Sequence, residues 1–201
     1  MLNKKIDIFE ARRQAFHIFL GIFIVMLLKY DIIGKWSILP CIAIGLLLSY
    51  LSRETKLPVI YWLIKIFERR DYVKKFPGRG MIFYLMGSFI VVAFFPKDIA
   101  MSSIMILALG DSSAHFFGLN FGRTKHPLSK TKLLEGTVAG LIAGFLGAVF
   151  FIKWHEALFS SLAAIIAEAI EVKIGNEHVD DNLIVPFVAG SVVWIMRNVL
   201  K

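Results

Sequence analysis

The chain has 201 residues, of which 57% are hydrophobic and 19% charged, and its mean hydropathy is +0.70. Soluble domains carry about a quarter charged residues, so this composition argues against a soluble domain and favours a protein that lies in lipid. The formal charge of +8 does not indicate a nucleic-acid partner, because the bases lie in short segments beside apolar runs, as in membrane proteins.

Seven apolar runs alternate with polar segments along the chain. Several are shorter than the ~20 residues of a comfortable membrane span, although ~17 suffice where flanking Lys and Arg reach the interface. We predict an all-α fold with a single domain over residues 1–201, a polytopic membrane helix bundle of about seven transmembrane helices, with six as the alternative count. The runs are Gln14–Leu28, Trp36–Leu51, Gly80–Pro96, Ile99–Phe121, Gly136–Ile152, Ala157–Glu171 and Leu183–Met196.

Two further segments bear on this layout. The run Leu57–Phe67 is too short to cross, and Pro58 with its basic flank predicts an amphipathic helix in the interface. The single cysteine, Cys41, lies inside an apolar run and allows no internal disulfide.

The distribution of basic residues predicts the orientation in the membrane. The connecting segments on one side hold 17 of the 23 Lys and Arg residues, and those on the other side hold six. The positive-inside rule therefore places the N-terminus in the cytoplasm and the C-terminus outside. We expect a multi-pass integral membrane protein whose polar, chemistry-capable residues gather on the cytoplasmic face, and the sequence does not predict its oligomeric state.

A carboxylate interrupts the fourth apolar run. At membrane depth an ionisable group costs at least ~2.5 kcal/mol, so Asp111 needs a partner, water or an ion. His115, Gly118 and Gly122 follow Asp111 at helical spacing and are predicted to share its face.

A polar, basic segment follows Gly122 and ends before Glu135. A carboxylate, glycines and clustered bases suit Mg²⁺ with a polyphosphate, since Mg²⁺ prefers carboxylate and phosphate oxygens and lysine meets phosphate as a point charge. The competing interpretation is a helix-packing aspartate followed by an ordinary positive-inside loop. The segment Gly118-x-x-x-Gly122-Arg123-Thr is not a Walker A loop, because it has three intervening residues and Arg in place of Lys.

A second polar group precedes and opens the last apolar run. Glu168 and Glu171 are three residues apart and face roughly the same way. The adjacent carboxylates Asp180 and Asp181, followed by Asn182, repel each other and gain from a shared cation, which favours a metal site or a general base. The alternative is a solvated turn that caps a helix.

A third group, Glu10, Arg13, His17 and Gly21, has the spacing of one helical face at the inner end of the first run. Arg and His suit a phosphate or a proton-transfer role, and the alternative is a hydrogen-bonded packing histidine. The charge count assigns all three polar groups to one membrane face. By contrast, the small-xxx-small series Gly136, Gly140 and Gly144 predicts close helix packing.

In order along the chain, these residues resemble the CTP-dependent lipid-alcohol kinase family, which includes dolichol kinase, phytol kinase and a CTP-using diacylglycerol kinase. The resemblance covers nearly the whole chain. It is carried by Glu10-x-Arg-Arg-x-x-x-His17, Gly110-Asp111 with Gly118 and Gly122, Lys130-Thr-Lys-Leu-Leu-Glu135-Gly136, Glu168-Ala and Asp180-Asp-Asn-Leu-x-x-Pro186.

The resemblance implies a multi-span bundle that transfers the γ-phosphate of CTP, with Mg²⁺, to the hydroxyl of an isoprenoid alcohol (a polyprenol of dolichol, phytol or geranylgeraniol type) or of diacylglycerol. Catalysis would involve Asp111, Glu168, Asp180 and Asp181, with Asp111 and Asp181 holding the metal. Arg13 and His17 would meet lipid or phosphate. Nucleotide binding would involve Gly118, Gly122, Arg123, Lys125, Lys130, Thr131, Lys132, Glu135, Gly136 and Asn182.

The chain departs from the family at one place. Many members have Lys-Ser before the Glu-Gly pair, where this chain has Thr131-Lys132-Leu133-Leu134, so the phosphate-binding residue stays open between Lys130 and Lys132.

Two other functions compete with the kinase. A CDP-lipid synthase of the phosphatidate cytidylyltransferase type shares the basic loop, but its later Gly-His-Gly-Gly signature has no counterpart here. A transporter or proton relay would line a water path with Asp111, His115 and Glu168, and would more often show two similar halves.

Overall fold

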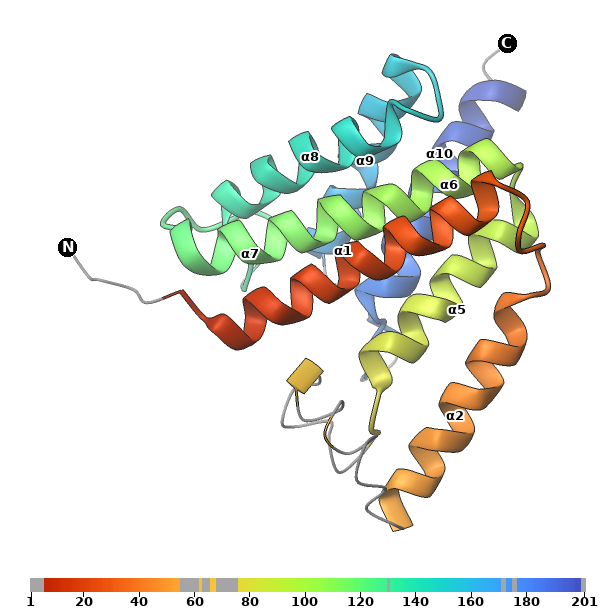
Figure 1. Cartoon of the computed structure of the whole chain (residues 1–201). Coiled ribbons are helices and arrows are strands. Elements are labelled where there is room, and N and C mark those ends of the chain that lie inside the picture. Colours follow the sequence, from red (N-terminus) through yellow and green to blue (C-terminus); the bar gives the residue numbers. More distant parts are fainter. Residues whose placement is uncertain are drawn as a thin grey trace.

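The computed structural model describes residues 6–54, 62, 66–67, 76–129, 131–170, 173–174 and 177–199. In this part of the chain, seven helices and one short hairpin form the fold (Figure 1). One of the seven is built from three consecutive segments, α6, η1 and α7. The elements are α1 (Ile8–Lys29), α2 (Ile38–Glu54), α5 (Arg79–Phe94), α6 (Lys97–Met105), η1 (Ile106–Asp111), α7 (Ser112–Phe121), α8 (Leu134–Ala148), α9 (Trp154–Ile170), β1 (Lys173–Ile174), β2 (Glu177–His178) and α10 (Asp181–Asn198).

The seven helices coincide with the seven predicted apolar runs, so the all-α prediction is confirmed. The first helix begins earlier than its apolar run because the Asp7 carboxylate accepts hydrogen bonds from the backbone N–H groups of Phe9 (3.0 Å) and Glu10 (3.3 Å). The antiparallel hairpin β1–β2, only two residues per strand, was not predicted. The interfacial helix expected at Leu57–Phe67 lies largely outside the described residues.

Two of the described helices are long and apolar enough to cross a bilayer. They are α1, with 22 residues, and the continuous helix Lys97–Phe121, with 25. Shorter apolar helices lie at Ile38–Arg53, Arg79–Phe94 and Leu134–Ala148. The count of seven spans, like the alternative of six, therefore stays a prediction.

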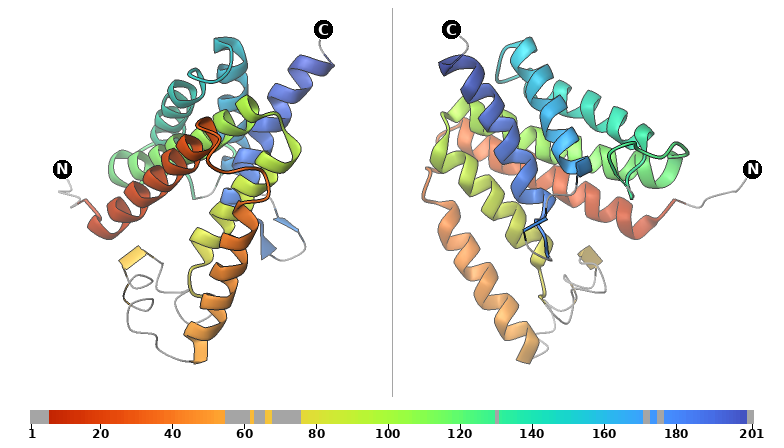
Figure 2. Two further views of the ribbon diagram at one scale, coloured as in Figure 1. Left: turned by 45° about the vertical axis from the view of Figure 1, so that its right-hand side comes forward. Right: turned by 180° about the vertical axis from the view of Figure 1, so that it is seen from behind.

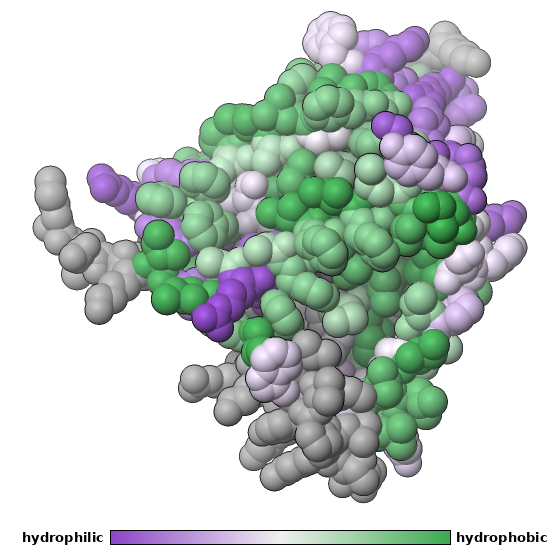
Figure 3. Space-filling model, in the orientation of Figure 1, coloured by the Kyte–Doolittle hydropathy of each residue, from purple (hydrophilic) through white to green (hydrophobic). Residues whose placement is uncertain are grey.

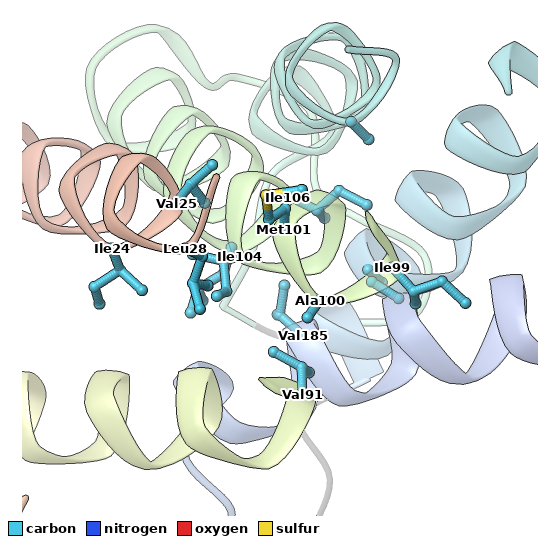
Figure 4. Close-up of a cluster of buried hydrophobic side chains, with 14 of the residues drawn as sticks. Ile24, Val25, Leu28, Val91, Ile99, Ala100, Met101, Ile104, Ile106 and Val185 are labelled. Atoms are coloured by element: carbon cyan, nitrogen blue, oxygen red, sulfur yellow. The ribbon is translucent and has the colours of Figure 1, made fainter. Parts of the chain in front are cut away.

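The continuous helix Lys97–Phe121 is the centre of the bundle. Within its apolar stretch 67% of the residues are buried, against 33% in α1. The core beside it is apolar, and Figure 4 shows Ile24 of α1, Val91 of α5 and Val185 of α10 around Ile104 of α6. Halfway along, the helix widens into the π-helix η1, which ends at Asp111.

The glycine series on α8 packs closely, as predicted. A Cβ placed at Gly140 would lie 2.7 Å from the Ala114 Cβ and 2.9 Å from the Gly110 carbonyl oxygen, so only glycine lets α8 approach η1 and α7 this closely. Similarly, a Cβ at Gly144 would lie 2.5 Å from the Ser161 hydroxyl of α9. The inner face of α8 is therefore a backbone surface, as in packed membrane helices.

The outer face of α8 is apolar and exposed. Val138, Ile142 and Leu146 follow one another at helical spacing and are each more than half exposed. Figure 3 shows hydrophobic side chains spread over the face formed by α1, the central helix and α8, with polar groups toward the ends. Soluble monomers rarely expose apolar patches larger than a few hundred Å², so this surface favours contact with lipid.

Ion pairs close one end of the bundle. The Arg197 guanidinium of α10 lies 2.8 Å from the Glu156 carboxylate of α9 and 2.6 Å from the Asp98 carboxylate of α6. At the same end the Lys97 ammonium lies 2.6 Å from Asp31, just after α1. The segments predicted to be outside therefore gather at one end of the molecule, whereas the side of the membrane they face stays a prediction.

The contact between α5 and α10 depends on a proline and a glycine. Pro186 has no N–H, so the Asn182 carbonyl four residues earlier lacks its helical partner. Gly87 of α5 lies directly against this carbonyl, since a Cβ at Gly87 would fall 1.9 Å from its oxygen. Figure 2 shows α10 between α5 and α9 behind the central helix.

We predict that Gly87→Ala lowers the free energy of unfolding by about 1–3 kcal/mol, the usual cost of overpacking, although alanine is favoured over glycine in an isolated helix by about 1 kcal/mol. Thermal unfolding in detergent, followed by circular dichroism, measures the change. Gly34→Ala is the matched control, because nothing lies within 4 Å of a Cβ at Gly34. Equal losses in the two variants would contradict the predicted contact.

The cytoplasmic orientation can be tested with single cysteines in a Cys41→Ser background, since Cys41 is the only cysteine. Thr131 and Lys153 are both exposed and lie at opposite ends of the bundle. We expect a membrane-impermeant maleimide to label Lys153→Cys in intact cells and Thr131→Cys only in inverted vesicles. The opposite pattern would reverse the predicted topology.

Candidate active site

A polar cavity of about 590 Å³ opens at the end of the bundle opposite the Arg197 ion pairs. It lies where the start of α1, the start of α5, α7, the loop before α8, the end of α9 and the start of α10 meet. The three polar groups predicted from the sequence converge here. The predicted residues that line it are Arg13, His17, Asp111, Gly118, Thr131, Lys132, Glu168, Asp180, Asp181 and Asn182.

Three carboxylates from three helices form an acid triad in the cavity wall. Asp111 ends η1, Glu168 lies near the end of α9, and Asp181 opens α10; one oxygen from each lies within 4.8 Å of the other two. Glu168 is only 2% exposed, and its Oε2 has no hydrogen-bond partner among the described residues. Carboxylates gathered in this way repel one another, and a positive charge beside them offsets the repulsion.

Lys132 supplies that positive charge. Its ammonium lies 2.5 Å from Glu168 Oε1 and 3.2 Å from Asp181 Oδ2. Burial alone would lower the pKa of Lys132, but the carboxylates of Glu168, Asp181 and Asp111 outweigh it and raise the pKa above its ordinary value. Of the two candidate lysines, Lys132 reaches the triad, whereas Lys130 lies outside the described residues.

The loop that carries Lys132 is held by its own polar groups. The Ser129 hydroxyl accepts hydrogen bonds from the backbone N–H groups of Thr131 (3.2 Å) and Lys132 (3.0 Å). At the start of the loop, Glu135 accepts from the backbone N–H and the hydroxyl of Thr124. Glu135 thus ties the beginning of the loop to the first turn of α8.

Among the predicted nucleotide-binding residues that the structure describes, five are not part of the cavity lining: Gly122, Arg123, Lys125, Glu135 and Gly136. Gly122 and Gly136 lie in close packing contacts, and their role in nucleotide binding stays a prediction. A Cβ at Gly122 would lie 2.4 Å from Leu133, and one at Gly136 would lie 2.4 Å from the Ala114 carbonyl oxygen. Sequence spacing alone did not separate these packing positions from the cavity wall.

Asp180 has a structural partner on each side. Its carboxylate caps α10 by accepting from the backbone N–H (3.2 Å) and the side-chain amide (2.8 Å) of Asn182. The Arg79 guanidinium, at the start of α5, lies 3.4 Å from the same carboxylate. Arg79 also lines the cavity, although it is not among the site residues predicted from the sequence. Its only signal in the sequence is that of a basic residue at the inner end of an apolar run.

Glu10 organises the α1 side of the cavity. Its Oε1 accepts from the Arg13 guanidinium at 2.5 and 2.9 Å and from the Gln14 amide at 2.7 Å, and it lies 2.9 Å from His115 Nε2 of α7. Glu10, Gln14 and His17 are each at most 5% exposed, which confirms the predicted shared face on α1. One carboxylate thus fixes Arg13 and connects α1 to α7.

We predict that Glu10→Ala lowers the free energy of unfolding by about 3–5 kcal/mol, because removing one partner leaves buried polar groups uncompensated. Asp31→Ala is the matched control. The Asp31–Lys97 pair has nearly the same length, 2.6 Å, but Asp31 is 82% exposed, so its loss should cost at most about 1 kcal/mol. Chemical denaturation in detergent compares the two, and similar losses would contradict the role given to burial.

The chain is homologous, over most of its length and at low identity, to CTP-dependent diacylglycerol kinases and phytol kinases. It is 26% identical to CTP-dependent diacylglycerol kinase 1 of Schizosaccharomyces pombe, over 93% of each chain. It is 30% identical to a probable phytol kinase of Triticum aestivum, over 59% of this chain and 44% of that one. It is also 27% identical to an uncharacterized protein of Methanocaldococcus jannaschii, over 94% and 95% of the two chains.

No family model matches the chain, and no solved structure matches it significantly. The homology agrees with the resemblance that the motifs indicate. It does not identify the acceptor, since the two kinds of kinase are named for different lipids.

Proposed function

We propose that this protein is a membrane lipid kinase that transfers the γ-phosphate of CTP to the hydroxyl of an isoprenoid alcohol or of diacylglycerol. The observation that carries the proposal is the cavity in which the acid triad Asp111, Glu168 and Asp181 faces the bases Arg13, Arg79 and Lys132. This arrangement suits a metal–triphosphate, because carboxylates bind the divalent cation and basic side chains bind the phosphates. The homologous kinases support CTP as the donor.

The triad fits a magnesium ion. Two ligand oxygens on one Mg²⁺ lie at most about 4.2 Å apart, and the triad oxygens lie within 4.8 Å of one another, so a small closure would suffice. Asp111 and Asp181, the two ligands predicted from the sequence, would hold the ion. When bound, Mg²⁺ would neutralise charge on the phosphates and align them for transfer.

The bases of the cavity would bind the triphosphate. Arg13 is held toward the cavity by Glu10, and Arg79 by Asp180. A planar guanidinium donates two parallel hydrogen bonds to a phosphate, and Lys132 adds a point charge. These fixed charges would stabilise the transferring phosphoryl group, since phosphoryl transfer depends mainly on positioning and electrostatics.

Glu168 is better placed than Asp180 to act as the general base for the acceptor hydroxyl. Its Oε2 is buried and free of hydrogen bonds among the described residues, whereas the Asp180 carboxylate caps α10 and pairs with Arg79. Glu168 would accept the proton of the acceptor hydroxyl while the hydroxyl oxygen bonds to the γ-phosphorus. The bond between the γ-phosphorus and the β-phosphate oxygen breaks, and CDP leaves.

The exposed apolar faces of the bundle support a lipid acceptor. An acceptor lying in the membrane beside α1 or α8 has its tail among the apolar side chains and its hydroxyl at the level of the cavity end. The length of the lipid tail would then be recognised by interchangeable apolar side chains, which do not select one lipid.

CTP labelled at the α or the γ phosphate tests the proposal with purified protein, Mg²⁺ and a panel of lipid alcohols. We expect the lipid to gain the γ label. Gain of the α label would indicate a CDP-lipid synthase, and gain of neither label with any acceptor would favour a transporter or proton relay.

We further predict that Asp111→Asn lowers turnover by at least about 100-fold, the scale at which loss of one electrostatic group lowers transition-state stabilisation. Asp31→Asn is the control, because Asp31 is an exposed carboxylate at the opposite end of the bundle. Full metal-dependent activity of folded Asp111→Asn would contradict the central role of this carboxylate.

A further inference from the structure

Lys132 lies where a cation would bind the acid triad. Its ammonium makes ion-pair contacts to two of the three carboxylates, at 2.5 Å to Glu168 and 3.2 Å to Asp181. The Lys132 side chain is only 24% exposed, so little water screens these contacts. A divalent cation that enters the triad therefore meets a positive charge that is already paired with Asp181, one of its two proposed ligands, and with Glu168.

We propose that Lys132 is the resident counter-ion of the triad, so that the site takes up a divalent cation together with a nucleotide and binds the free cation weakly. This inference rests on the proposed function. Nucleotide phosphates supply the anion to which the displaced ammonium transfers. Metal and nucleotide then bind with positive cooperativity, and the acidic cluster is never left without a cation.

The triad retains the capacity to bind a metal ion while Lys132 is present. Glu168 lines the cavity, and its Oε2 is buried and has no hydrogen-bond partner among the described residues. Asp111 contributes the third carboxylate, and no contact to the Lys132 ammonium as short as an ion pair is found for it in the described part of the chain. An ion bound there with Lys132 still in place is opposed by like-charge repulsion at short range.

Replacement of the Lys132 ammonium by a divalent cation requires movement of the lysine side chain alone. The Lys132 backbone is fixed, since its N–H donates to the Ser129 hydroxyl and its carbonyl accepts from the His126 N–H at 3.2 Å. The next residue, Leu133, pairs with Lys125 in a β-bridge. The four-carbon stem of Lys132 is flexible and lets the ammonium move from the carboxylates toward a phosphate without refolding the loop.

Binding of Mn²⁺ to the purified full chain, followed by electron paramagnetic resonance with and without a non-hydrolysable CTP analogue, tests the inference. For the wild-type protein we expect the analogue to tighten Mn²⁺ binding at least about tenfold, within the usual range of coupling between two ligands. By reciprocity, Mn²⁺ tightens binding of the analogue by the same factor. In Lys132→Met we expect free Mn²⁺ to bind about tenfold more tightly and the analogue to tighten Mn²⁺ binding less than it does in the wild-type protein.

Two variants serve as controls. Lys153→Met removes one positive charge from an exposed position at the opposite end of the bundle and should leave both affinities unchanged, which excludes an effect of net charge. Lys132→Arg keeps the charge and should keep free Mn²⁺ binding weak, and thermal unfolding verifies that each variant is folded.

The outcomes separate the inference from the proposed function. If Lys132→Met does not tighten free Mn²⁺ binding while the wild-type protein transfers the γ-phosphate, the counter-ion role is wrong and the kinase stands. If no protein binds Mn²⁺ with or without the analogue, the metal site and the inference are both wrong.

Discussion

The gathering of three carboxylates, one buried and two partly buried, at one end of an apolar bundle is the constraint on which the rest of the structure depends. Asp111, Glu168 and Asp181 come from η1, α9 and α10, so the end of each segment must reach the same small volume. Their mutual repulsion is opposed by Lys132, which lies in the loop that connects α7 to α8. Without the lysine or another cation, repulsion among the carboxylates would push the ends of these helices apart.

The two ends of the molecule use charge differently. At the far end, Arg197 pairs with Glu156 and Asp98 and so joins α6, α9 and α10. At the near end, charges of both signs line a cavity of about 590 Å³. Between them lies an apolar exterior with a glycine-rich interior, as expected where lipid surrounds packed helices. The ion pairs of Arg197 that join helices and the candidate active site thus lie at opposite ends of the molecule.

Much of this arrangement could be predicted from the sequence, because apolar runs and ionisable interruptions are local features. The positions of the helices, the shared face of Glu10 and His17, and the convergence of the polar groups follow from that pattern. The partner of Lys132 could not be predicted, since Glu168 lies 36 residues away and only packing brings the two together. Likewise, nothing local separates Glu135, which binds Thr124, from the carboxylates of the cavity.

The π-helix η1, which ends at Asp111, sets the direction in which α7, the cavity-lining half of the central helix, faces. A π turn holds one more residue than an α turn, and one residue corresponds to a rotation of about 100° around the axis. The core-facing residues of α6 and the cavity-facing residues of α7 therefore belong to two different angular registers joined at η1. The extra residue in η1 accommodates the angular offset between the two halves of the helix. Substitutions that change the packing of α6 therefore need not rotate the cavity-facing residues of α7, and the two halves could evolve separately.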